Sequence, residues 1–168
     1  MAWRGSTSVQ DRFFACLPYA FPMIESMAFG TVLMLQFPVL RLILIPLTPF
    51  AMIYSILNTL LGGFGGFVIF FALYLLIVRN DSLSHFLRFN TMQALITGIA
   101  VSLIGALLQL LGVSQNLVGA SFLPLTIIFS TIFLAVLGIV IYSIIQCIRG
   151  RYAEIPVLSE AAYSQTRY

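Results

Sequence analysis

The side chains with the greatest capacity for chemistry gather in residues 78–95, VRNDSLSHFLRFNTMQAL, between stretches that are almost purely apolar. This segment contains the only histidine of the chain, His85, and two of its arginines, Arg79 and Arg88. An unperturbed histidine titrates at about pH 6.5, so His85 is a candidate pH sensor, although packing at a membrane interface is its simpler role. Two interpretations of the whole segment stay open: helix anchoring by interfacial side chains, and a docking or conduction surface.

Asn90, Gln93 and Thr97 form a polar stripe, because they recur at positions i, i+3 and i+7 of a helix. Amide groups are costly to expose to lipid, so this stripe must face another helix, a water-filled groove or a partner. Small residues on a different side of the same helix predict a close approach of helix backbones. These packing residues are Ala94, Gly98, Gly105 and Gly112.

Glu25 is the only acidic residue within an apolar segment. It either pairs with an arginine or lines a polar cavity, and both interpretations stay open. One histidine and two separated cysteines, Cys16 and Cys147, cannot form a metal cluster. The chain also lacks a G-x-S-x-G nucleophile motif and a P-loop. We therefore expect no metal, no cofactor and no catalytic residue.

The elements that position these residues must lie in a membrane. The chain has 168 residues, of which 61% are hydrophobic and only 8% charged, with a mean hydropathy of +1.07. Soluble proteins carry about 25% charged residues, so the lipid bilayer is the expected partner of this surface. The net charge of +3 is too small for a nucleic-acid-binding patch. The composition predicts an all-α integral membrane protein, with residues 1–168 as a single membrane domain.

Runs of apolar residues predict a bundle of four transmembrane helices, at about 39–61, 64–79, 90–112 and 122–148. Prolines at 46 and 49 should kink the first span, and GGFGG at 62–66 should turn the chain. An amphipathic pattern from Leu83 predicts an in-plane helix before the third span, capped by Asp81 or Ser82. Residues 149–168 form a polar, soluble tail.

The arginines predict the orientation of these spans. They lie before the first span, between the second and third, and after the fourth, while the two remaining loops carry no charge. Positive residues favour the cytoplasmic side, so both termini and the loop 79–89 are expected on the cytoplasmic or stromal side. Residues 13–38 have an arginine near each end and contain three prolines and Glu25. We expect this segment to be re-entrant or interfacial; a fifth span with the N-terminus outside is the alternative.

Several stretches together resemble the 20-kDa subunit family of the chloroplast inner-envelope translocon (Tic), and its cyanobacterial-type homologues in particular. They are DRFFACLPYAFPMIESMAFG, QFPVL, VRNDSLSHFLRFNTMQAL and EIPVLSEAAYSQ. The likeness covers nearly the whole chain, and RNDSLSHFLRFNTMQA is its most specific part. The family motif falls on Arg79, Asn80, Ser84, His85, Phe86, Arg88, Phe89, Asn90, Met92 and Gln93. The resemblance implies four membrane helices with both termini on the stromal or cytoplasmic side. It also implies a role in moving preproteins, as a channel-forming or core subunit.

The leading hypothesis is therefore a membrane-embedded subunit of a protein translocation or import complex, which contributes to a protein-conducting channel. Four spans are too few to enclose a wide pore, so homo-oligomers or other translocon subunits must complete the wall around polypeptide clients. The candidate client or partner contacts are Glu25, Arg79, Asn80, His85, Arg88, Asn90, Gln93 and Thr97. A scaffold or assembly factor for a photosynthetic membrane complex is the alternative. An ion or small-solute channel is less favoured, and an intramembrane enzyme least.

Only twelve residues precede the first apolar run, which is too short for a transit peptide. The expected location is a cyanobacterial plasma or thylakoid membrane, or the plastid inner envelope if the protein is made in an organelle.

Overall fold

The computed structural model describes residues 7–113, 123–156 and 158–166, and every regular element in these ranges is helical. The predicted all-α class is confirmed for this part of the chain. The α-helices are α1 (Val9–Cys16), α2 (Ala20–Ser26), α3 (Thr31–Gln36), α4 (Val39–Leu44), α5 (Thr48–Leu60), α6 (Gly65–Leu73), α7 (His85–Leu110), α8 (Leu123–Ile148) and α9 (Leu158–Thr166). Short 3-10 turns, η1 (Leu17–Tyr19) and η2 (Ile45–Leu47), and a π-helical turn, η3 (Tyr74–Val78), connect some of them.

Three stretches of the described chain are helices long and apolar enough to cross a membrane. They are Val39–Leu60 with 22 residues, and α7 and α8 with 26 residues each. Gly65–Val78, which comprises α6 and η3, is also apolar but shorter. The arrangement of four spanning helices therefore stays a prediction, since its second member falls below the usual length of about 20 residues.

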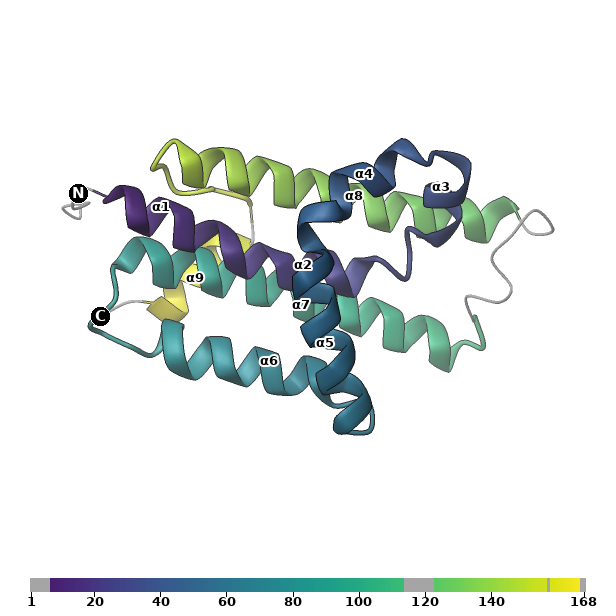
Figure 1. Cartoon of the computed structure of the whole chain (residues 1–168), viewed down its shortest axis with the longest axis horizontal. Helices are drawn as coiled ribbons and strands as arrows, with labels where there is room; N and C mark the ends of the chain where they lie inside the picture. Colours follow the sequence, from purple (N-terminus) through teal and green to yellow (C-terminus); the bar gives the residue numbers. More distant parts are fainter. Residues whose placement is uncertain (1–6, 114–122, 157, 167–168) are drawn as a thin grey trace.

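Residues 9–26 form a helical rod of α1, η1 and α2, which runs alongside α7 and contacts both α7 and α8 (Figure 1). The rod begins with a capping box: the hydroxyl of Ser8 accepts from the backbone N–H of Asp11 at 3.0 Å, and the Asp11 carboxylate accepts from the N–H of Ser8 at 3.1 Å. Pro18 lacks an N–H, and the helix tightens to a 3-10 turn around it. One face of the rod is buried, including Ala15, Tyr19 and Met23. Whether this segment re-enters or lies at the interface stays a prediction.

Between the rod and α6 the chain breaks repeatedly at prolines and glycines. α3 ends at Gln36, just before Pro38, and the helix breaks again at η2, which contains Pro46. α5 then crosses the direction of the other long helices (Figure 1). Gly62 and Gly63 adopt positive φ angles of 58° and 98°, which lets the chain reverse tightly into α6.

The predicted in-plane helix before the third span is corrected by the structure, because α7 runs without interruption from His85 to Leu110. Its N-cap is Ser84, whose hydroxyl accepts from the N–H of Leu87 at 3.3 Å, and not Asp81 or Ser82. Residues 85–97 contain neither proline nor glycine, and Phe86 and Phe89 are buried. The helix therefore continues, because nothing in this stretch breaks the backbone hydrogen bonds.

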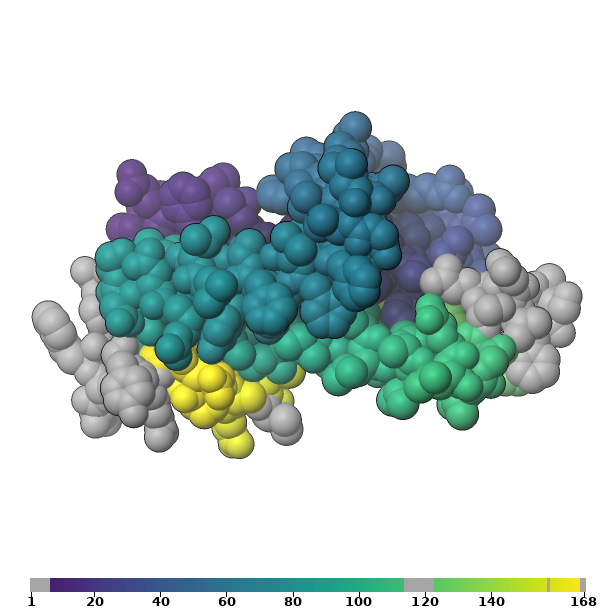
Figure 2. Space-filling view, turned by 90° about the horizontal axis from the view of Figure 1, so that it is seen from below, coloured from purple at the N-terminus to yellow at the C-terminus, as the bar shows by residue number. Residues whose placement is uncertain are grey.

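The tail after α8 folds back, and α9 packs on the first half of α7. The rings of Tyr152 and Tyr163 lie 5.0 and 4.4 Å from that of Phe89, between ring centroids. Figure 2 shows α9, in yellow, seated against the teal surface of the preceding helices. The start of α1, the loop 79–84 and α9 all lie at one end of the molecule (Figure 1).

Candidate functional site

Arg88 connects the start of α7 with the end of η3. Its Nε donates to the carbonyl of Val78 at 2.8 Å, and its Nη1 lies 2.9 Å from the Asp81 carboxylate. Because the last carbonyls of a helix have no partner within it, Arg88 satisfies a group that would otherwise be buried unpaired. Only 7% of Arg88 is exposed. This predicted contact residue therefore stabilises the turn between the two helices.

Ser84 joins the start of α7 to the start of α1. Its hydroxyl donates to the carboxylate of Asp11 at 2.8 Å. Partial burial acts to raise the pKa of Asp11, but hydrogen bonds from Ser8 and Ser84 outweigh it and lower that pKa below its ordinary value. Gly150 permits the close approach of the tail, since a Cβ there would lie 2.7 Å from the Thr7 hydroxyl.

His85 lies in an aromatic cluster with the tail. Its Nδ1 is 3.0 Å from the hydroxyl of Tyr152, and its ring stacks on that of Tyr163 with centroids 6.3 Å apart. The imidazole is still exposed to solvent on one side. The tail therefore restricts the access of any partner to His85.

Arg79 and Asn80 remain on the surface of the loop that leads to α7. The side-chain oxygen of Asn80 accepts from the backbone N–H of Ser82 at 3.1 Å and from its hydroxyl at 2.6 Å. Such local bonds are typical of Asx turns. Arg79 is thus the predicted site residue that offers a charged group to an approaching partner.

Asn90 connects three helical elements in the interior. Its amide nitrogen donates to the Phe86 carbonyl at 2.8 Å, and its oxygen accepts from the hydroxyl of Tyr19 and the thiol of Cys147, each at 3.2 Å. The side chain is completely buried. The polar stripe was expected to face another helix, a water-filled groove or a partner, and Asn90 faces other helices.

The rest of the stripe is also internal. Thr97 is 3% exposed, and its hydroxyl donates to the backbone carbonyl of Gln93 at 2.8 Å. Gln93 is fully buried, and neither its amide nitrogen nor its oxygen has a hydrogen-bond partner among the described residues. The stripe therefore does not form an open polar wall on the surface of the chain.

The small residues of α7 do not all serve the same purpose. Ala94 is completely buried, and a Cβ at Gly98 would lie 2.4 Å from the ring of Phe21, so this glycine admits that ring. A Cβ at Gly105 would make an ordinary contact of 3.5 Å with Phe29. Gly112 follows the end of α7 with a φ of 74° and open space around it. Close packing thus extends to the middle of α7, where the ring of Phe21 fills the gap that Gly98 leaves.

Glu25 lies apart from these groups, on α2, and bridges to α5 and α7. Its Oε1 accepts from the hydroxyl of Tyr54 at 2.8 Å, and its Oε2 accepts from that of Ser102 at 3.0 Å. No described arginine pairs with it, so the ion-pair interpretation is not supported. Instead Glu25 lines a cavity of about 480 Å³ between α2, α5, α6 and α7.

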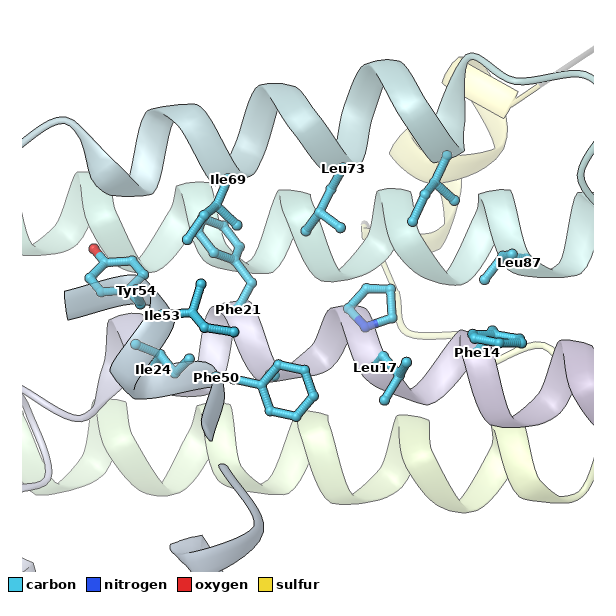
Figure 3. A pocket seen from close by; sticks show the side chains of 13 residues that line it. Phe14, Leu17, Phe21, Ile24, Phe50, Ile53, Tyr54, Ile69, Leu73 and Leu87 are labelled. Carbon is cyan, nitrogen blue, oxygen red and sulfur yellow. The ribbon is translucent and has the colours of Figure 1, made fainter. Parts of the chain in front are cut away.

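A second cavity, of about 300 Å³, lies beside the first and is almost wholly apolar (Figure 3). Phe21 and Tyr54 line both cavities. Figure 3 shows the Tyr54 hydroxyl directed away from Ile53 and Phe50. The ring of Tyr54 therefore lines the apolar cavity, while its hydroxyl donates to Glu25.

Sequence reasoning missed the partners that give these residues their roles, namely Asp11, Tyr19, Tyr54, Ser102 and Cys147. Hydroxyl groups within otherwise apolar helices were an available signal for Tyr54 and Ser102, because a buried hydroxyl needs a hydrogen-bond partner. Among the described residues, no cluster of three or more His, Cys, Asp or Glu side chains could hold a metal ion.

Comparison with known proteins gives consistent matches along the chain. A sequence model of the family described as "Chloroplast import apparatus Tic20-like" matches residues 9–162. The chain is 40% identical over 168 residues to the "Tic20 family protein" of Synechocystis sp., covering all of both chains. It is 33% identical to "Tic20 family protein Ycf60" of Porphyra purpurea, over 96% of this chain and 78% of that protein. It is 29% identical to "Protein TIC 20-v, chloroplastic" of Arabidopsis thaliana, over 95% and 73%, respectively.

Proposed function

Because the chain belongs to the Tic20-like family of the chloroplast import apparatus, we propose that it is a membrane-embedded subunit of a complex that translocates polypeptides. The observation that carries this proposal is the family match over residues 9–162, which include the three long apolar helices. The proposal assigns no catalytic reaction to the chain.

In this proposal residues 1–168 form one membrane domain with four spans, in which Gly65–Val78 is the short second span. Both termini and the loop 79–84 lie on the cytoplasmic or stromal side. The clustering of arginines supports this orientation: Arg12, Arg79, Arg88, Arg149 and Arg151 lie on or next to the elements gathered at one end of the molecule.

A conduit for polypeptides would not run through the interior of a single chain. The polar stripe of α7 is packed between helices, and Asn90 and Thr97 are hydrogen-bonded there. The client path is therefore a groove on the outside of the bundle, completed by further copies or by other subunits of the complex. The cavity at Glu25 and the exposed loop residue Arg79 are the contacts that we assign to clients or partners.

Site-specific photo-crosslinking tests this proposal. A crosslinker replaces Arg79 in native membranes, and a control crosslinker replaces Leu134, which is 48% exposed on α8. We expect many different secreted or membrane-inserting polypeptides among the products from Arg79 and few from Leu134. A single abundant membrane protein from Arg79 would instead indicate a scaffold, and would contradict the proposal.

A further inference from the structure

Glu25 is the only acidic residue of the described chain that lies away from the end formed by the start of α1, the loop 79–84 and the tail. It sits one residue before the end of α2, and its partner Ser102 belongs to the second half of α7. The carboxylate is therefore placed along the length of the apolar helices. In such surroundings an acidic group is costly unless a positive charge or several donors accompany it.

The contacts within the chain satisfy this carboxylate only in part. Two neutral hydroxyl groups, those of Tyr54 and Ser102, each donate one hydrogen bond. A carboxylate has about four lone-pair positions for hydrogen bonds. Glu25 thus retains acceptor capacity, and the cavity beside it is where a further donor could enter.

The cavity is lined by aromatic rings and is open at the surface. Besides Glu25 and Ser102 its lining includes Phe21, Tyr54, Phe67, Phe70 and Phe71. The rings of Phe67 and Phe71 belong to exposed residues, 64% and 53%, so they stand at the edge of the cavity. Aromatic faces attract cations, and most strongly away from water.

Gly66 keeps the carboxylate within reach of the cavity. A Cβ on Gly66 would lie 2.9 Å from Glu25 Oε1 and 3.1 Å from the Tyr54 hydroxyl. Any side chain at this position would therefore push against the carboxylate and its donor. The absence of a side chain leaves the room that a ligand needs.

We propose that the cavity binds the cationic side chain, lysine or arginine, of a polypeptide segment that lies beside α6 in the membrane. This inference rests on the proposed function, because it takes a client polypeptide as the source of the cation. The chemistry supports it on two counts: the carboxylate supplies the opposite charge and can accept two parallel bonds from a guanidinium, and the rings enclose the apolar stem of the side chain.

A reconstituted system tests the charge preference. The full chain, carrying a photo-crosslinker in place of Phe67, is placed in nanodiscs of digalactosyldiacylglycerol, a lipid without charge or amine. Two hydrophobic peptides long enough to span the bilayer are compared, which differ only in a central arginine or glutamine. We expect at least about tenfold more crosslinking of the arginine peptide, since desolvated charge pairs contribute strongly to binding. Glu25→Gln should abolish this preference, and Glu25→Asp should retain part of it.

Two glycine variants control for folding. Gly66→Ala keeps the charge of Glu25 but crowds its carboxylate, and should reduce the preference for the arginine peptide. Gly138→Ala is the matched control, because a Cβ there meets nothing within 4 Å, and it should leave the preference unchanged.

Equal crosslinking of both peptides by the wild-type chain would overturn the inference, as would a preference that survives Glu25→Gln. A preference that disappears when phosphatidylethanolamine is added would assign the cavity to a lipid amine and would also overturn it. These outcomes leave the proposed function standing, because that is tested separately by the client crosslinks from Arg79.

Discussion

At the scale of single residues, the polar groups of the segment 78–95 mainly hold helices together. Arg88 binds the end of η3, Ser84 binds Asp11, and Asn90 binds Tyr19 and Cys147. The structural interpretation of this segment therefore accounts for most of its hydrogen-bonding capacity. Arg79 is the cationic residue of this segment that remains exposed.

Asn90→Ala should destabilise the protein by about 1–3 kcal/mol, because the buried hydroxyl of Tyr19 loses its acceptor. Thermal unfolding in detergent measures this change. Gln109→Ala is the matched control on the same helix, since Gln109 is exposed, and it should leave the melting temperature nearly unchanged. Equal melting temperatures for Asn90→Ala and the wild type would contradict the role of Asn90 as an internal joint.

The lowered pKa of Asp11 predicts how the stability of the folded protein depends on pH. The pKa of the Asp11 carboxyl in the folded state lies below the ordinary value of 3.8. The contribution of Asp11 to folding stability is therefore complete above pH 3.8, and it is lost as the pH falls through the folded-state pKa. Asp11→Asn removes the titrating group. The melting temperature of the wild type should therefore exceed that of the variant near neutral pH, and the two should converge in acid. A gap that stays constant down to about pH 3 would contradict this account.

At the scale of elements, the sequence predicts where apolar helices lie better than how they meet. Hydrophobic length predicts the long helices, and Gly62 and Gly63 make the turn expected at GGFGG. The prediction of a separate in-plane helix from Leu83 was wrong because Arg88 is buried and tied to the preceding turn. Its partners, the Val78 carbonyl and Asp81, become neighbours only after the chain reverses, and helical spacing contains no information about such contacts.

The same limit applies to the candidate site. The isolated acid in an apolar segment marks Glu25 as unusual, but spacing cannot show that Tyr54 and Ser102, which are 29 and 77 residues away, reach its carboxylate. The polar stripe of α7 can be predicted from the sequence. Whether the stripe faces another helix, a water-filled groove or a partner depends on how α1 and α8 pack, which helical spacing does not show.

The packing of α1 against α8 predicts a crosslink between the two cysteines. The Cys147 thiol lies 3.8 Å from the carbonyl oxygen of Ala15, the chain neighbour of Cys16, and both cysteines are free. Mild oxidation with copper-phenanthroline and oxygen should therefore join them within one chain. Maleimide mass tags, added after denaturation, should then modify neither thiol.

Cys16→Ser controls for this reaction, because Cys147 alone should remain available to the mass tag after oxidation. If both thiols of the oxidised wild-type protein still react, α1 does not pack on the end of α8 in the membrane.

At the scale of the whole molecule, the structure gathers charge at one end and leaves apolar surface elsewhere. The start of α1, the loop 79–84 and α9 share that end (Figure 1). α4, which carries Arg41, lies away from it, so this arginine adds no support to the predicted orientation. Exposed aromatic and aliphatic side chains cover α5, α6 and the second half of α7, and an apolar surface of this extent is typical of contact with lipid or with other proteins.

The most direct measurement of the central claim is the transport of clients when the protein is depleted from its native host. Pulse-labelling follows a panel of secreted and membrane-inserted polypeptides before growth slows, with and without a restoring copy of the gene. We expect unprocessed precursors of several clients to accumulate on depletion, and to disappear when the wild-type protein is restored. Normal processing of every client, with the loss of one assembled membrane complex, would contradict a role in translocation.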